Sequence, residues 1–352
     1  MKFLDIDTPA VLVDLNIVQS NIRAFQSYCD SIDLKLRPHI KTHKIPMLAK
    51  MQIEEGAIGI TCQKISEAES IISEGGINDV LITYNIFGKK KLRRLLALSR
   101  KVNLSVVVDN IQCIEGLSSV FRNAESTLRV LIECDTGAMR CGVVTPHEAL
   151  DLAKVITRLP GIIFDGLMTY PPASATYKVN NFLTKTKQLL ESNNISVPKV
   201  SVGGSPDMWN AHKLSIATEY RIGTYIYNDR SLLERGTCTE KDCALTVLAT
   251  VVSTPSKDRA VIDAGSKALT SDLVNLIGHG YIVGYPNLNI STLSEEHGCI
   301  TSEGPTELQV GQKLRIIPNH ACVVSNMFDH VILKHKEKSY FKQLVKARGK
   351  VW

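Results

Sequence analysis

A single lysine stands at the end of a short strand-like run with basic residues on both sides. The segment contains Arg37, His39, Lys41, His43 and Lys44. Nearby positive charge makes an ammonium group easier to deprotonate, and a neutral amine can form a Schiff base with an aldehyde. Lys41 is therefore our candidate for a reactive amine. The alternative is a basic, solvated turn, which an isolated run of this kind indicates more often.

A second candidate site is the pair His320 and Cys322, which one residue separates. In an extended segment, residues two apart point to the same face, so an imidazole and a thiolate could reach one metal ion. Two protein ligands are too few for a structural zinc site, but they suit a catalytic ion with open positions. Taken alone, however, such a pair is more often two packed side chains.

Two glycine-containing loops have the composition of phosphate-binding loops. The first holds Gly203, Gly204 and Ser205, and the second holds Gly223 and Thr224. Glycine lets backbone N–H groups approach a phosphate closely. Because Gly-Gly-Ser-Pro is also an ordinary turn, either loop alone is a weak signal.

The elements that must position these residues can be predicted from hydrophobic periodicity. After a strand at 10–14 and a helix at 15–29, eight short apolar runs alternate with amphipathic helical patterns. The runs cover residues 34–38, 58–62, 80–84, 104–109, 128–134, 162–167, 199–202 and 219–222. Eight strand-then-helix units predict an α/β fold with a closed parallel (β/α)8 barrel of the TIM type.

The chemistry of such barrels gathers at the carboxyl ends of the strands. Lys41 follows the first of the eight strands, and the two glycine loops follow the seventh and eighth. The loops after strands seven and eight are also where these barrels commonly hold phosphate. The candidate residues therefore fall at one end of the predicted barrel.

The pattern changes in the last third of the chain. Short β-rich runs with turns are predicted at 244–252, 260–263, 280–285, 313–317 and 330–333. We therefore predict a barrel domain over residues 1–235 and a mostly β domain over residues 236–352. His320 and Cys322 lie in the second domain.

Composition is that of a soluble enzyme. The 352 residues are 44% hydrophobic, enough to bury a large core, and no apolar run approaches the roughly 20 residues of a membrane helix. The segment Met1–Asp5 lacks the apolar stretch of a signal peptide, so we expect a cytoplasmic protein without a membrane partner. Nine scattered cysteines are expected to be thiols, and a net charge of +6 that is mostly spread out makes nucleic acid an unexpected partner.

The full segment Arg37–Lys44 resembles the Pro-His-x-Lys-Thr-His signature of the D-threonine aldolase and D-serine dehydratase family, which is related to alanine racemase. Further matching motifs follow in order at Asp135 to Val143, Gly203 to Pro206, Thr218 to Tyr225, Asp263 to Gly265, Glu295 to Gly298, and Pro318 to Cys322. Together the motifs cover nearly the whole chain. One such motif would be weak, but six in the right order are a strong signal.

The resemblance implies pyridoxal phosphate as the cofactor, bound to Lys41, and a small D-amino acid as the substrate. It also implies that His320 and Cys322 bind a divalent metal, for which zinc is expected and manganese or magnesium are alternatives. The opening strand is expected to join the second domain, and two subunits to form a homodimer. The cofactor contacts implied by the resemblance are His39, Arg140, Tyr170, Gly203, Gly204, Ser205, Arg221, Gly223, Thr224 and Tyr225.

The resemblance leaves several reactions open. β-Elimination from D-serine or a related compound would give ammonia and a 2-oxo acid, whereas retro-aldol cleavage of D-threonine or D-3-hydroxyaspartate would give glycine and an aldehyde. His-x-Cys at the metal position is typical of the dehydratases. The aldolases place a histidine shortly after the residue that matches Tyr170, and this chain has none there. We therefore expect elimination, with a racemase or a non-enzymatic cofactor carrier as further alternatives.

Overall fold

The computed structural model describes residues 5–335 and 339–352. Most of the segment Met1–Asp5, for which no signal peptide was predicted, lies outside the described residues. The chain divides into two compact units. The first, here called the barrel unit, comprises Phe25–Lys41, Pro46–Gly223 and Lys350–Trp352. The second, the β-rich unit, comprises Met1–Ala24, Thr42–Ile45 and Thr224–Gly349.

The described part of the barrel unit holds eight parallel strands in the order β2-β9-β8-β7-β6-β5-β4-β3. Their bounds are β2 (Lys35–Pro38), β3 (Ile60–Cys62), β4 (Asp79–Ile82), β5 (Asn103–Val108), β6 (Leu128–Glu133), β7 (Ile162–Met168), β8 (Val200–Gly203) and β9 (Glu219–Ile222). Between β2 and β3, the Ile58 N–H donates to the Leu36 carbonyl over 3.0 Å, and His39 and Thr61 form a single parallel bridge. The barrel is thus nearly closed, and the predicted fold class is confirmed.

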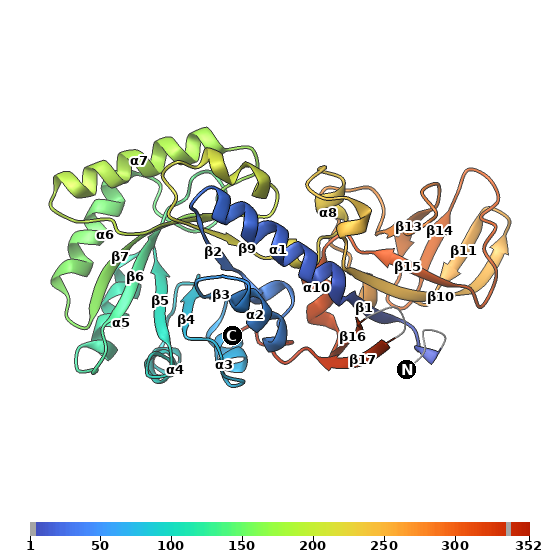
Figure 1. Ribbon diagram of the computed structural model, residues 1–352, viewed down its shortest axis with the longest axis horizontal. Helices are drawn as coiled ribbons and strands as arrows, with labels where there is room; N and C mark the ends of the chain where they lie inside the picture. The colour runs from blue at the N-terminus through green and yellow to red at the C-terminus, as the bar shows by residue number, and fades with distance from the viewer. Residues whose placement is uncertain (1–4, 336–338) are drawn as a thin grey trace. The chain divides into compact units, whose positions relative to one another are not determined.

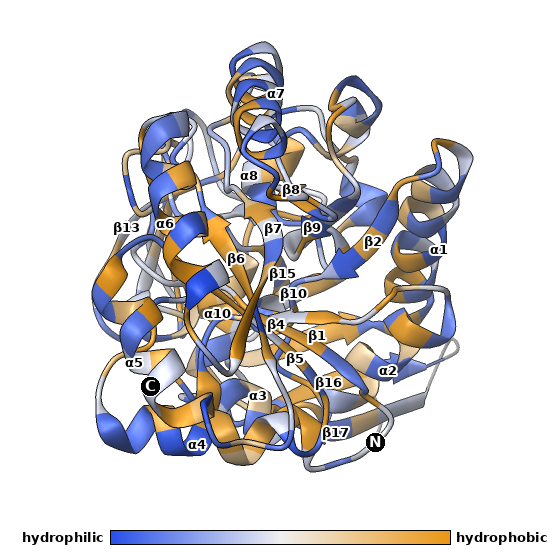
Figure 2. Ribbon diagram, turned by 90° about the vertical axis from the view of Figure 1, so that its left-hand side faces the viewer, coloured by the Kyte–Doolittle hydropathy of each residue, from blue (hydrophilic) through white to orange (hydrophobic). Residues whose placement is uncertain are grey.

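Helices alternate with these strands around the barrel (Figure 1). They are α2 (Pro46–Glu54), α3 (Ile65–Ile72), α4 (Lys89–Ser99), α5 (Ile111–Phe121), α6 (Pro146–Arg158) and α7 (Thr176–Ser192). Helix α6 starts where its sequence directs, because Thr145 accepts a hydrogen bond from the Glu148 N–H and Pro146 occupies the first turn. The strands β4, β5 and β6 are coloured largely hydrophobic in Figure 2, whereas α4 and α6 carry both colours, as expected for helices with one buried face.

The described part of the β-rich unit contains a nine-stranded sheet. Its strands are β1 (Ala10–Asp14), β10 (Leu245–Ser256), β11 (Arg259–Ile262), β12 (Tyr281–Ile282), β13 (Asn289–Leu293), β14 (Gly298–Thr301), β15 (Lys313–Ile317), β16 (His330–His335) and β17 (Ser339–Leu344). The opening strand β1 pairs antiparallel with β10 and parallel with β16, so it joins this sheet.

Short helices complete the β-rich unit: α8 (Arg230–Leu233), α9 (Ser266–Leu269) and α10 (Ala321–Met327). Helix α1 (Leu15–Ser31) runs on from β1 and has residues in both units. Among the described residues, none of the helices has the length and apolar character needed to span a lipid bilayer.

A charged network is buried inside the barrel. The guanidinium of Arg37 donates to Glu219 Oε2 over 3.0 Å and to Asp79 Oδ1 over 2.5 Å. Burial disfavours the charge on Glu219, yet Arg37 holds the pKa of that carboxyl below its ordinary value. The positive charge of Arg37 is therefore balanced by these two carboxylates.

We expect Arg37→Met to lower the free energy of unfolding by about 3–5 kcal/mol, because Glu219 would keep a buried charge without its main partner. The matched control is Lys187→Met, which removes the exposed partner of Glu191 on α7 and should cost less than about 1 kcal/mol. Urea denaturation followed by circular dichroism measures both values. Equal losses in the two variants would contradict a stabilising role for the buried network.

Candidate cofactor and metal sites

Lys41 lies in a single 3-10 turn, Ile40–Thr42, directly after β2. Its backbone N–H donates to His39 Nδ1 over 3.4 Å, and His39 Nε2 lies 3.1 Å from Gln63 Oε1. The Lys41 side chain is partly exposed, and within the described residues its ε-amino group has no hydrogen bond or ion pair. An amine at the carboxyl end of a barrel strand and without a competing partner fits attack on an aldehyde.

Arg221 extends from β9 into the barrel interior. Its Nη1 donates to Ser201 Oγ over 2.6 Å, and its Nη2 donates to the Thr169 carbonyl over 2.8 Å. Burial lowers the pKa of Arg221 to about 10, with Glu219 opposing the shift, so the guanidinium stays charged at neutral pH. These two bonds leave further N–H donors, which fits a cationic hydrogen-bond partner for a ring nitrogen.

Arg140 and Tyr170 also lie together in the barrel unit. The guanidinium carbon of Arg140 is 4.7 Å from the centre of the Tyr170 ring, a cation–π contact. On its other side, Arg140 Nη2 is 4.0 Å from Glu133 Oε1, at the end of β6. Burial raises the pKa of Glu133, while Arg140 and Arg221 oppose that shift. The structure thus brings together the cationic residues expected around a cofactor ring.

The first glycine loop has a packing reason for one of its glycines. A Cβ on Gly203 would lie 1.9 Å from the Arg221 carbonyl oxygen, so β8 and β9 could not pair as they do with any other residue. The Gly204 N–H already donates to that carbonyl over 3.0 Å. Ser205, at the end of this loop, and Gly223, after β9, belong to the same unit, whereas Thr224 and Tyr225 belong to the β-rich unit.

The candidate metal pair lies at the start of α10. His320 has extended backbone, but Cys322 is in the first turn of the helix, so the expected extended segment is wrong. Cys322 Sγ is 3.1 Å from the Thr42 hydroxyl and 3.6 Å from the Thr224 hydroxyl. Thr42 is the residue directly after Lys41 in the chain. Thr224, expected at the phosphate, therefore contacts the thiol of the candidate metal pair.

Two carboxylates hold the His320–Cys322 segment, and the sequence did not predict either. Oδ2 of Asp272 lies 2.6 Å from His320 Nδ1, and Oδ2 of the buried Asp229 accepts the Ala321 N–H over 3.1 Å. The hydrogen bond with Cys322 is the main cause that raises the pKa of His320 to about 9; burial opposes it and Asp272 adds to it. Asp272 is 48 positions before His320, so no sequence spacing could have revealed the pair.

The donor set at this place fits a divalent metal of intermediate softness. One imidazole nitrogen and one thiolate sulfur are the donors that zinc prefers. Among the described residues, no group of three or more His, Cys, Asp or Glu side chains is arranged as metal ligands. A metal at His320 and Cys322 would therefore keep positions open for water or substrate.

The acidic motif after β13 lies in an exposed hairpin turn between β13 and β14. Lys267 Nζ is 2.7 Å from Glu295 Oε2 and 2.8 Å from Glu296 Oε1, and the His297 carbonyl accepts the Ser294 N–H. Asp263 Oδ1 accepts the Thr250 N–H over 2.7 Å. These contacts of Glu295, Glu296, His297 and Asp263 are with neighbouring groups of the β-rich unit.

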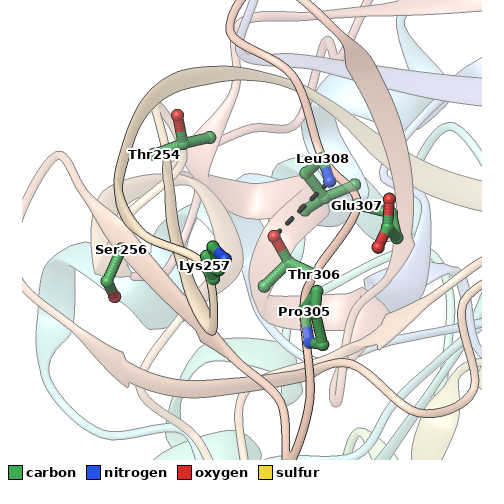
Figure 3. A pocket seen from close by; sticks show the side chains of 7 residues that line it. All are labelled: Thr254, Ser256, Lys257, Pro305, Thr306, Glu307 and Leu308. Atoms are coloured by element: carbon green, nitrogen blue, oxygen red, sulfur yellow. Dashed lines mark hydrogen bonds between the residues drawn. The ribbon is translucent and has the colours of Figure 1, made fainter.

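A pocket of about 590 Å³ in the β-rich unit contains none of the predicted site residues. Figure 3 shows the side chains that line it: Thr254, Ser256, Lys257, Pro305, Thr306, Glu307 and Leu308. The Thr306 hydroxyl accepts the Leu308 N–H over 3.4 Å, which shapes the loop on one side. With only one amine and one carboxylate, this pocket lacks the donor set of either candidate site.

Comparison with known proteins identifies the family. The alanine racemase N-terminal domain matches residues 13–231, and the serine dehydratase domain matches residues 244–333. D-threonine aldolase of Arthrobacter sp. is 33% identical over 342 residues, which cover 93% of this chain and 89% of the relative. The solved D-threonine aldolase of Filomicrobium marinum has a TM-score of 0.92 at 29% identity, covering 100% of this chain and 98% of the other.

A further solved structure is a D-threo-3-hydroxyaspartate dehydratase with one cysteine changed to alanine, in the metal-free form. Its TM-score is 0.89 at 27% identity, and the match covers 98% of both chains. The nearly closed parallel barrel joined to a β-rich unit defines an enzyme of the alanine racemase type. Within that class, the chain belongs to the D-threonine aldolase and D-serine dehydratase family, and it is a lyase. Membership confirms the resemblance found in the motifs and implies pyridoxal phosphate as the cofactor.

Proposed function

We propose that the protein is a pyridoxal phosphate- and metal-dependent lyase that acts on D-β-hydroxy amino acids. The observation that carries the proposal is the ε-amino group of Lys41, which stands without a partner among the described residues at the carboxyl end of β2. In this proposal Lys41 carries the cofactor and moves the α-proton of the substrate. Pyridoxal phosphate, when bound, supplies an electron sink for the charge that develops at the α-carbon.

The other barrel residues would bind and orient. Arg221 would face the pyridine nitrogen, and because an arginine stays protonated there, that nitrogen would stay unprotonated. Arg140, held between Tyr170 and Glu133, would contact the ring oxygen. The phosphate would be held by Gly203, Gly204, Ser205 and Gly223, with His39 beside the lysine.

In the β-rich unit, His320 and Cys322 would hold the divalent ion. Zinc is the proposed metal because it suits nitrogen and sulfur donors, and a cation there would supply a Lewis acid for the substrate hydroxyl. A metal-free form of one relative is consistent with a metal in this family. The homodimer and the cytoplasmic location stay predictions.

We infer β-elimination as the reaction, with loss of the α-proton and of hydroxide and, after hydrolysis, release of a 2-oxo acid and ammonia. Two features support it: Cys322 in the metal pair, and the loop Tyr170–Thr176, which offers no histidine as a base for the hydroxyl proton. Retro-aldol cleavage is the second candidate, because relatives such as D-threonine aldolase match nearly the whole chain.

Product analysis separates the two reactions. Purified enzyme with D-serine, D-threonine or D-3-hydroxyaspartate should release a 2-oxo acid and ammonia in equal amounts, and no glycine. Release of glycine with an equal amount of aldehyde would show that the reaction is retro-aldol cleavage and not elimination. Conversion to the L-enantiomer without loss of amino acid would indicate a racemase, and no turnover of any D-amino acid would leave only a cofactor carrier.

A further inference from the structure

We propose that Asp272 is a positioning residue that orients the His320 imidazole for the metal ion and raises the metal affinity of the site. This inference rests on the metal role proposed above for His320 and Cys322. Oδ2 of Asp272 lies 2.6 Å from Nδ1 of His320. A ring N–H that donates to a carboxylate fixes the imidazole tautomer, so the other ring nitrogen keeps its lone pair for a metal.

The carboxylate of Asp272 is itself held in place by its own loop. Its second oxygen, Oδ1, accepts the Val274 N–H over 3.4 Å, and the Asp272 N–H donates to the Thr270 hydroxyl over 3.1 Å. Both carboxylate oxygens therefore have a partner, one in the loop and one on the imidazole. An acceptor held at both ends restricts how far the His320 ring can rotate.

The loop that presents Asp272 is strained. Thr270, Val274 and Asn275 have φ values of 66°, 44° and 66°, and two of these residues are β-branched. For β-branched residues a positive φ is a genuine outlier, and such strain persists where surrounding contacts determine the conformation. Glycine would remove the strain at any of the three positions. The surrounding contacts therefore hold the loop, and with it Asp272, in this strained conformation.

The remaining parts of the pair are held by different groups. Asp229 accepts the backbone N–H of Ala321, between the two candidate ligands, and the Thr42 hydroxyl lies 3.1 Å from Cys322 Sγ. Asp229 is buried and also caps α8 through the Leu232 N–H, so a change there would disturb folding. Asp272 is partly exposed on a loop, which makes it the position where orientation of the imidazole can be tested apart from stability.

The test measures the zinc affinity of the enzyme. Its metal is first removed by a chelator under conditions that leave pyridoxal phosphate bound. Zinc is titrated in competition with a chromophoric chelator for wild type, Asp272→Asn and Asp272→Ala. We expect the dissociation constant to rise about 10–100-fold in the alanine variant and less in the asparagine variant, whose amide oxygen still accepts the N–H. The metal-free unfolding midpoint should fall only slightly, because the Asp272 side chain is partly exposed. Asp329→Asn, which removes an exposed carboxylate 3.5 Å from Arg348, is the matched control and should bind zinc as wild type does.

A dissociation constant for Asp272→Ala within twofold of wild type would overturn the inference. So would a lowered metal-free midpoint with unchanged affinity, because that result assigns Asp272 to folding alone. Titration of His320→Ala and Cys322→Ala tests the underlying metal role separately. If both of these weaken zinc binding and Asp272→Ala does not, only the role of Asp272 is lost; if neither weakens it, the proposed metal site is lost as well.

Discussion

Changing Lys41 to alanine should lower turnover at least about a thousandfold and remove the visible absorbance band of the bound cofactor. Arginine at the same position should have the same effect, because a guanidinium keeps the charge but cannot condense with an aldehyde. The physical reason is that Lys41 is proposed both to hold the cofactor and to move the α-proton. Steady-state rates and absorbance spectra of the purified variants measure the two effects.

The matched control is Lys35→Ala, which removes an exposed lysine from the other end of the same strand, β2. That variant should keep the rate and the spectrum of the wild type. Borohydride reduction followed by peptide mass mapping then locates the trapped cofactor. An adduct on any other lysine, or a Lys41→Ala variant with an unchanged spectrum, would remove Lys41 from the mechanism.

Much of the barrel could be predicted because local physics defines its elements. The predicted alternation of strands and amphipathic helices is observed, and each barrel strand lies within two residues of a predicted apolar run. Helix α2 has a weaker sequence signal, although Pro46 is a favourable first-turn residue. Its short sequence has little separation between polar and apolar faces, which is the signal that periodicity requires.

The β-rich unit was harder to predict because several of its strands have a weak sequence signal. Strands β13, β14 and β17 were missed, since their sequences mix polar and apolar residues, although β13 pairs with the neighbouring β14 and β17 with the neighbouring β16. The prediction of extended backbone at Cys322 was also wrong. Helix α10 starts there because the distant Asp229 accepts the Ala321 N–H, and no local pattern reveals such a contact.

The candidate site also contains some residues that the sequence could indicate and others that it could not. Residues with chemically distinctive side chains, such as Lys41, His320 and Cys322, can be proposed from sequence because the motifs contain them. The residues that hold them, such as Asp229 and Asp272, could not, because an aspartate in a loop has many ordinary roles. The environment of Arg37 was likewise hidden, since Glu219, which neutralises it, is 182 positions away.

Removal of the metal should silence the enzyme almost as completely as loss of the lysine. Dialysis against a strong chelator is expected to lower turnover about a hundredfold or more, because the hydroxyl would lose its Lewis acid while the cofactor stays bound. Zinc should restore the rate better than manganese or magnesium, since the thiolate of Cys322 is a poor ligand for hard cations. Atomic absorption and the rate after addition of each ion measure the two effects.

Variants of the proposed ligands test whether the ion that the chelator removes is the one at His320 and Cys322. His320→Ala and Cys322→Ala should each reproduce the chelated rate and gain little from added zinc, while the absorbance band of the cofactor persists. The matched controls are His330→Ala and Cys299→Ala in the same unit, an exposed imidazole and a partly exposed thiol, which should respond to zinc as wild type does. Full activity in chelator would exclude a catalytic metal. A chelator-sensitive rate that survives in both ligand variants would instead require that the ion bind at other residues, since only direct ligands make metal loss and ligand loss equivalent.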